Sequence, residues 1–245
     1  TAGDVNGDGY ADVIVGAPYY TNGETVEGQA YVFAGSAAGL STIRHWSAES
    51  NQGGAHLGYS VGTAGDVNGD GYADVIVGAP LYNNGESAEG QAFVFAGSAA
   101  GLGTKRHWSA ESNQADARFG NSVATAGDVN GDGYADVIVG ASLFDNDQTD
   151  EGRAFVFLGS AAGPCATSNW STDSDQAHAE LGYSVATAGD VNGDGYADVI
   201  VGAPTYDNGQ TDEGLAFIFL GSAAGLGTTP AWTADSDQAH ANFGY

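Results

Sequence analysis

The sequence predicts an all-β fold of packed four-stranded antiparallel blades, and three observations lead to this prediction. Each 62-residue unit reads as four short strands separated by turn residues. Runs such as Val75–Val77 and Phe93–Phe95 are apolar at every position, so both faces of these strands are expected to be covered. Blades that cover one another around an axis describe a β-propeller. The third observation is a nine-residue stretch that recurs unchanged every 62 residues, as Asp4–Asp12, Asp66–Asp74, Asp128–Asp136 and Asp190–Asp198.

The second unit shows the strands expected in every blade. Leu57–Gly65 is the first strand and leads into the repeated loop, and Ala73–Pro80 is the second strand, which ends at the proline. Gln91–Gly97 is the third strand, and the fourth is centred on Trp108, with equivalents at Trp46, Trp170 and Trp232. The sequence therefore predicts one array over residues 1–245, with units of about 1–56, 57–118, 119–180 and 181–242, and with residues 243–245 opening the next first strand.

The number of blades in the complete ring stays open. Phe243–Tyr245 has the register of Leu57–Tyr59, and Thr1–Gly3 has that of Thr63–Gly65, so the two ends are halves of one inner strand. A closed four-blade ring would join them. If the complete ring has seven or eight blades, this chain supplies only four of them. Its terminal blade edges would then be exposed and would favour self-association. A linear stack of sheets is the structural alternative.

The repeated loop has the spacing of a calcium site. Its oxygen-bearing side chains stand at positions 1, 3, 5 and 9, and Gly9 at position 6 permits the sharp turn that such loops need. Three neighbouring carboxylates repel one another unless a cation lies between them. A simple turn between strands requires neither Asp4 nor Asp12, and an EF-hand requires a Glu at position 12, where this chain has Val15. The pattern therefore favours Ca²⁺, with one site in each of the four repeats.

Composition limits the partners and the location. The chain has 31 acidic and 5 basic residues and a formal charge of −26, which argues against nucleic acid or an anionic membrane as a partner. It has no apolar run of the roughly 18 residues that a membrane span needs. Its one cysteine, Cys165, cannot form an internal disulfide. Because calcium sites of modest affinity fill outside the cell, we expect an extracellular or cell-surface protein.

Other candidate sites carry weaker signals. The histidines share no common register, so we expect no catalytic cluster and no enzymatic activity. The tryptophans favour packing between blades over a sugar-stacking platform. Arg44–Trp46 and Lys105–Trp108 are the only basic spots, and they suit either an anionic ligand or a solvated edge. Asn169 begins the one glycosylation sequon. The loops that vary most between repeats are candidates for recognition, and they are Tyr19–Glu27, Leu81–Glu89, Leu143–Glu151 and Thr205–Glu213.

The combined motifs resemble a known family. Phe119–Ala124, the loop Asp128–Asp136 and Val139–Ala141 together resemble the FG-GAP repeat of the integrin α-subunit propeller and of bacterial secreted proteins. The third repeat departs from the pattern with Ser142 in place of proline. The resemblance implies that each loop joins the two inner strands of a blade and binds Ca²⁺. The implied ligands, with the tyrosines acting through their carbonyls, are Asp4, Asn6, Asp8, Tyr10, Asp12, Asp66, Asn68, Asp70, Tyr72, Asp74, Asp128, Asn130, Asp132, Tyr134, Asp136, Asp190, Asn192, Asp194, Tyr196 and Asp198.

The resemblance also guides the expected function. It implies an extracellular calcium-binding β-propeller that serves in adhesion or protein interaction, with an extracellular protein or glycan as its ligand. A lectin-like carbohydrate-binding propeller is one alternative. A structural subunit that self-associates through its blade edges into an extracellular polymer is another, and a non-catalytic accessory domain of a secreted enzyme is a third.

Overall fold

The computed structural model describes all 245 residues, and it contains β-strands and no helix. The strands form four antiparallel sheets, one for each repeat. The first three strands are β1 (Val13–Ala17), β2 (Gln29–Phe33) and β3 (Arg44–Glu49). The second sheet holds β4 (Val61–Gly65), β5 (Asp74–Ala79), β6 (Gln91–Phe95) and β7 (Trp108–Glu111). The third holds β8 (Phe119–Gly127), β9 (Asp136–Ala141), β10 (Arg153–Phe157) and β11 (Trp170–Asp173), and the fourth holds β12 (Ser184–Gly189), β13 (Asp198–Ala203), β14 (Leu215–Phe219) and β15 (Trp232–Asp235).

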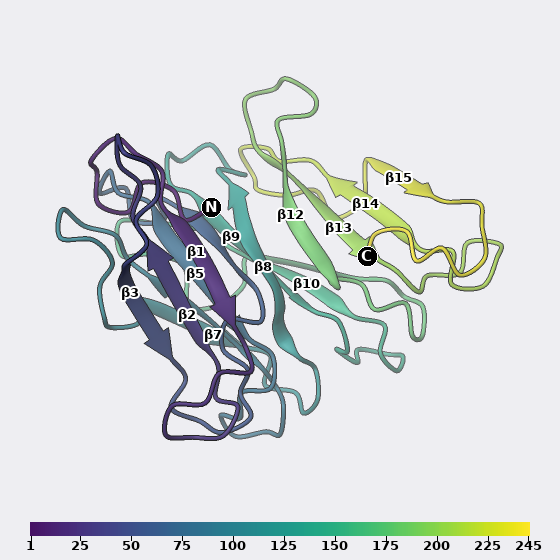
Figure 1. The fold of residues 1–245 in the computed structure, drawn as a ribbon. Coiled ribbons are helices and arrows are strands. Elements are labelled where there is room, and N and C mark those ends of the chain that lie inside the picture. The colour runs from purple at the N-terminus through teal and green to yellow at the C-terminus, as the bar shows by residue number, and fades with distance from the viewer.

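Strands that follow one another in sequence are neighbours in every sheet, so each blade is a meander (Figure 1). The first sheet has three strands because the chain enters it part-way through the inner strand, where Gly3 pairs with Asp12 in an isolated bridge. In the second blade the inner strand begins at Val61 and not at Leu57. Leu57 instead pairs in parallel with Gly28 of the preceding blade, so this segment links two blades. The fourth strand begins at Trp108 and is not centred on it.

The core lies between the blades. Val75 and Val77 of β5 pack in one cluster with Ile14 and Val32 of the first blade. Ile76, the residue between them, packs in another cluster with residues of the third blade. All six residues of β5 are buried. Side chains alternate across a strand, so a blade covered on both sides must be apolar at every position. This observation confirms the prediction made from the continuous apolar runs.

Glycines allow the backbones of neighbouring blades to approach each other closely near the inner strands. A Cβ added to Gly16 would lie 1.9 Å from the carbonyl oxygen of Gly58, and one added to Gly78 would lie 2.0 Å from that of Gly120. Any side chain at these positions would therefore force the blades apart. The paired glycines explain why the Phe-Gly or Leu-Gly segment of one unit and the Gly-Ala segment of the preceding unit recur together.

The repeated tryptophans join consecutive blades. Trp46 packs edge-on against Phe95 of the next blade, with ring centroids 4.8 Å apart. Its Nε1–H donates to the carbonyl of Gly103 at 2.9 Å. Trp108 donates in the same way to the carbonyl of Cys165 at 2.8 Å. These tryptophans are packing residues, as the sequence favoured.

The four sheets do not close into a ring (Figure 1). Trp232 of the last blade has no following blade and is 47% exposed, whereas Trp46 is 7% exposed. At the other end, Val15 of β1 is 45% exposed although its equivalent Val77 is fully buried. The closed four-blade ring is therefore not observed, and each end of the array presents one bare blade face.

Candidate calcium loops and inter-blade clefts

In the second to fourth blades the repeated loop connects the first and second strands, and in the first blade it joins the Gly3–Asp12 bridge to β1, so all four loops lie at corresponding blade ends. Each loop turns through two glycines with positive φ, at +72° for Gly7 and +89° for Gly9 in the first copy. A Cβ on Gly7 would lie 2.7 Å from the ring of Tyr72 in the next loop. Neighbouring loops therefore touch, and the same glycines that shape one loop make room for the next.

The side chains at positions 1, 3 and 5 turn inward over their own loop. Asp4 Oδ1 accepts the N–H of Gly7 at 2.8 Å, and Asp4 Oδ2 accepts that of Gly9 at 2.8 Å. Asn6 Nδ2 donates to Asp8 Oδ2 at 3.2 Å. The loop thus gathers side-chain oxygens at one exposed place, and oxygens are the ligands that Ca²⁺ takes.

In the fourth copy, backbone hydrogen bonds favour the charged form of the first aspartate. Asp190 accepts N–H groups from Gly193 and Gly195 at 2.7 and 2.9 Å. The backbone N–H of Gly195 is the main reason that the pKa of Asp190 is lowered from its usual value. A charged carboxylate in this position suits a cation.

The aspartate at position 9 has a structural contact that the sequence did not predict. Asp74 is fully buried, and its two carboxylate oxygens accept N–H groups from Val67 at 2.9 Å and from Gly97 at 2.8 Å. Val67 belongs to the loop and Gly97 follows the third strand, so the carboxylate ties these two segments together. Burial raises the pKa of Asp74 to about 6, against the lowering effect of the two hydrogen bonds.

The same arrangement holds Asp12, Asp136 and Asp198 in the other blades, each on a loop N–H and a second N–H after the third strand. Each carboxylate oxygen has two lone pairs, so one hydrogen bond leaves it able to accept another partner. The ligand role that the resemblance implied for these four aspartates stays a prediction.

Away from the repeated loops, the structure has two groups of three carboxylates. Within each group, one oxygen of every carboxylate lies within 4.8 Å of the others. The groups are Glu151, Asp173 and Asp175 in the third repeat, and Glu213, Asp235 and Asp237 in the fourth. In the third repeat Arg153 pairs with Asp173 at 2.6 Å and already supplies a positive charge. The sequence missed these groups because their members come from separate segments whose spacing matches no metal motif.

The variable polar loops at the opposite blade ends are fastened by a buried glutamate. Glu89 is 1% exposed, and its Oε1 accepts the backbone N–H groups of Asn84 and Glu86. Its carbonyl accepts the hydroxyl of Ser112 at 2.8 Å. The last residue of each of these loops is therefore structural, while the loop tips remain exposed to solvent.

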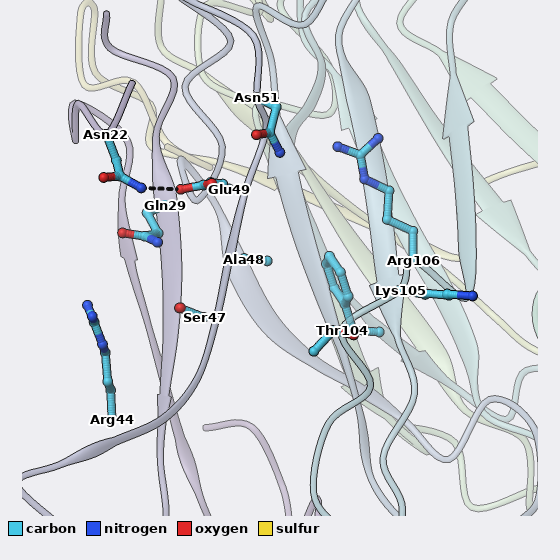
Figure 2. Close-up of a pocket in the computed structure, with 11 residues that line it drawn as sticks. Asn22, Gln29, Arg44, Ser47, Ala48, Glu49, Asn51, Thr104, Lys105 and Arg106 are labelled. Carbon is cyan, nitrogen blue, oxygen red and sulfur yellow. Dashed lines mark hydrogen bonds between the residues drawn. The ribbon is translucent and has the colours of Figure 1, made fainter. Parts of the chain in front are cut away.

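A cleft of about 640 Å³ lies between the outer strand β3 of the first blade and the segment that precedes β7 of the second. Figure 2 shows Arg44 on one side of this cleft and Lys105 and Arg106 on the other, with Ser47 and Ala48 between them. In the sequence these basic residues form two separate spots. They come together because Arg44 and Arg106 occupy equivalent positions in adjacent blades.

With this geometry in view, the family can be assigned from comparison with known proteins. The FG-GAP repeat model matches residues 1–33, 57–95, 119–157 and 181–219. The chain belongs to the FG-GAP repeat family. The matched segments cover β1 and β2 of the first blade and the first three strands of each of the other three blades, which confirms the resemblance inferred from the sequence.

Several curated proteins are similar to this FG-GAP chain. Integrin alpha-PS2 of Drosophila melanogaster is 32% identical over 84% of this chain and 15% of its own length. Integrin alpha-V of Gallus gallus is 32% identical over 82% of this chain and 19% of its own length. The phosphatidylinositol-glycan-specific phospholipase D of Homo sapiens is 31% identical over 78% of this chain and 24% of its own length. The chain thus spans less than a quarter of each of these relatives.

Among solved structures, the exotype rhamnogalacturonan lyase YesX matches 97% of this FG-GAP chain and 46% of its own chain, with a TM-score of 0.50. The two sequences are 17% identical, so the match concerns the fold alone. Within the FG-GAP chain, no helix is long and apolar enough to cross a membrane.

Proposed function

We propose that this chain is a calcium-stabilised FG-GAP propeller array of an extracellular or cell-surface protein, and that it serves in adhesion or molecular interaction. The observation that carries the proposal is the loop geometry, in which Asp4, Asn6 and Asp8 direct their oxygens over one exposed loop. The same arrangement recurs in all four blades. The integrin α subunits among the relatives support an interaction role, and the whole of residues 1–245 is proposed to form one array.

In each loop the side chains at positions 1, 3 and 5 and the carbonyl at position 7 would hold the ion, together with the lone pairs left free at position 9. Bound Ca²⁺ would supply two positive charges where at least two carboxylates meet. Metal binding that occurs only in the folded state adds its free energy to stability. We therefore infer that calcium fixes the loops, and through Asp74 and its equivalents fixes the ends of the third strands.

Calorimetric titration of the metal-stripped chain tests this proposal. The expected result is four Ca²⁺ per chain and a melting temperature several degrees higher with calcium than with excess chelator. Asp8→Ala should reduce the stoichiometry from four to three, since it removes a carboxylate from one loop only. An unchanged melting temperature after verified metal removal contradicts the proposal.

The bare end faces favour a second role in assembly. Trp46, Trp108 and Trp170 each donate to a carbonyl 57 residues ahead, in the next blade. Trp232 at one end and Leu40 at the other are exposed, while Leu226, the counterpart of Leu40 in the last blade, is buried in a core cluster with Trp170 against it. We infer that the two faces are complementary and that further FG-GAP blades, from another copy or from a longer chain, cover them.

A further inference from the structure

The cleft between the first and second blades concentrates positive charge in an otherwise acidic protein. Three of the five basic residues of the chain, Arg44, Lys105 and Arg106, line it, while the whole chain carries a formal charge of −26. The ion pairs of the structure, defined by a nitrogen–oxygen distance of at most 4.0 Å, involve Arg153, His178 and His240. None of the three basic residues in the cleft is among them. The cleft therefore holds unpaired cations.

The one carboxylate in this cleft does not neutralise them. Glu49 Oε2 accepts a hydrogen bond from Asn22 Nδ2 at 2.8 Å, drawn as a dashed line in Figure 2. Arg106 lies 4.0 Å from the centroid of the Phe93 ring, and its Nη2 donates to the carbonyl of Ser50 at 3.3 Å. These contacts hold the guanidinium in place without using most of its five donors.

The cleft between the second and third blades provides an internal comparison. This second cleft, of about 430 Å³, keeps the amides and the carboxylate of the first as Asn84, Gln91 and Glu111. Thr104, Lys105 and Arg106 are replaced there by Ala166, Thr167 and Ser168. Trp46 and Trp108 make equivalent ring and hydrogen-bond contacts across the two blade interfaces. The positive charge is therefore not needed for blade packing, and packing alone does not explain it.

The remaining lining indicates the chemistry of the ligand. Nine of the eleven lining residues are not hydrophobic, and amides and hydroxyls prominent among them include Asn22, Gln29, Asn51, Ser47 and Thr104. Amides and hydroxyls both donate and accept hydrogen bonds, as the hydroxyls of a sugar also do. Ala48 and Phe95 are the only apolar lining residues, which leaves little surface for the apolar anchors that peptide ligands commonly bury.

We propose that this cleft binds an acidic oligosaccharide, whose carboxylates pair with Arg44, Lys105 and Arg106 and whose hydroxyls contact the amides. Arginine forms charge-assisted, two-pronged hydrogen bonds with carboxylates, so the two guanidinium groups set the orientation of the chain of sugars. This inference names a ligand class for the interaction module proposed above. It involves none of the residues assigned to calcium.

Titration of the calcium-loaded chain with a hyaluronan hexasaccharide tests the inference. The expected result is binding with one site per chain that weakens about tenfold between 50 and 300 mM salt, because exposed ion pairs are screened. The same hexasaccharide with its carboxylates reduced to alcohols should bind at least about tenfold more weakly, since it loses the charge-assisted bonds. Hexa-aspartate distinguishes an acidic peptide as the ligand.

Matched variants locate the site. Arg44→Gln and Lys105→Gln should each weaken binding about tenfold. Arg118→Gln removes the same charge from an exposed position outside the cleft, and it should change the affinity less than about twofold. The double variant Thr167→Lys with Ser168→Arg places the counterparts of Lys105 and Arg106 in the second cleft, which lacks a third base because Arg106 faces the first cleft, so a second and weaker site should appear.

Four outcomes overturn the inference: no binding at millimolar hexasaccharide, equal binding of the reduced sugar, an equal loss in Arg118→Gln, and tighter binding of hexa-aspartate. The melting temperature with and without chelator is measured on the same samples. A chain that calcium stabilises but that binds no hexasaccharide contradicts only the cleft assignment. A chain that binds the sugar without any calcium effect contradicts only the calcium proposal.

Discussion

Replacing Trp108 and Trp232 by alanine compares one side chain with and without a following blade. Trp108 is 8% exposed, lies 4.9 Å from the Phe157 ring centroid and donates to the Cys165 carbonyl at 2.8 Å. Trp→Ala changes in a core cost about 3–5 kcal/mol through lost burial and the cavity left behind. Trp232 is 47% exposed, so solvent can fill the space, and we expect Trp232→Ala to cost about 1 kcal/mol or less.

These values set the size of the expected thermal shift. A loss of 1 kcal/mol lowers the melting temperature by about 2–4 °C in a domain of 150–250 residues. Trp108→Ala should therefore lower it by about 6–20 °C, and Trp232→Ala by about 4 °C or less. Trp108→Phe keeps most of the buried surface but loses the Nε1–H donor, so it should cost about 0.5–1.5 kcal/mol, the usual net value of one hydrogen bond.

Calorimetry and circular dichroism at saturating calcium measure the three variants at micromolar concentration, where the end faces are expected to be free. Equal shifts for Trp108→Ala and Trp232→Ala would refute the argument that the following blade causes the difference. Repeating the scans over a twentyfold range of concentration separates this result from association, because a Trp232 covered by another copy gives a concentration-dependent shift.

Three further predictions concern the loops and the end faces. Asp74→Ala should destabilise the chain even in excess chelator, by about 2 kcal/mol, because two buried N–H groups lose their acceptor; a loss confined to calcium-loaded protein contradicts the structural contact. Asp70→Ala should leave stability in chelator within about 0.5 kcal/mol of the parent chain and lose one of four calcium ions, as titration calorimetry can check. Val15→Asp and Trp232→Asp should each reduce the particle mass measured by light scattering at high concentration, whereas an unchanged mass distribution would show that these faces do not mediate association.

The sequence alone was enough to predict the blade architecture and the position of the repeated loops. Identical nine-residue loops at a fixed interval defined the repeat, and the continuous apolar run Val75–Val77 required cover on both faces. Both signals are local, because they depend on the order of residues within one strand or one loop. The family assignment follows from the same local signals, since its motifs lie within a single unit.

The tertiary structure decided the features that join separate segments. The sequence identified Asp74 only as a residue of the repeated loop. In the structure it also accepts the N–H of Gly97, 23 residues away. In the sequence Arg44 and Arg106 lie in two separate basic spots. The packing of adjacent blades places both residues on the same cleft. Contacts of this kind depend on how blades pack, which spacing within one unit does not contain.

The exposed end faces of the array also show which features the sequence predicts and which depend on the tertiary structure. Trp46 and Trp232 have equivalent positions in the sequence, because repeats of the same pattern carry no information about which blade has a neighbour. The structure separates them by exposure, at 7% and 47%. Burial depends on the presence of a covering surface, so a residue's pattern in the chain specifies the kind of contact it can make, and the three-dimensional arrangement of blades determines whether that contact is made.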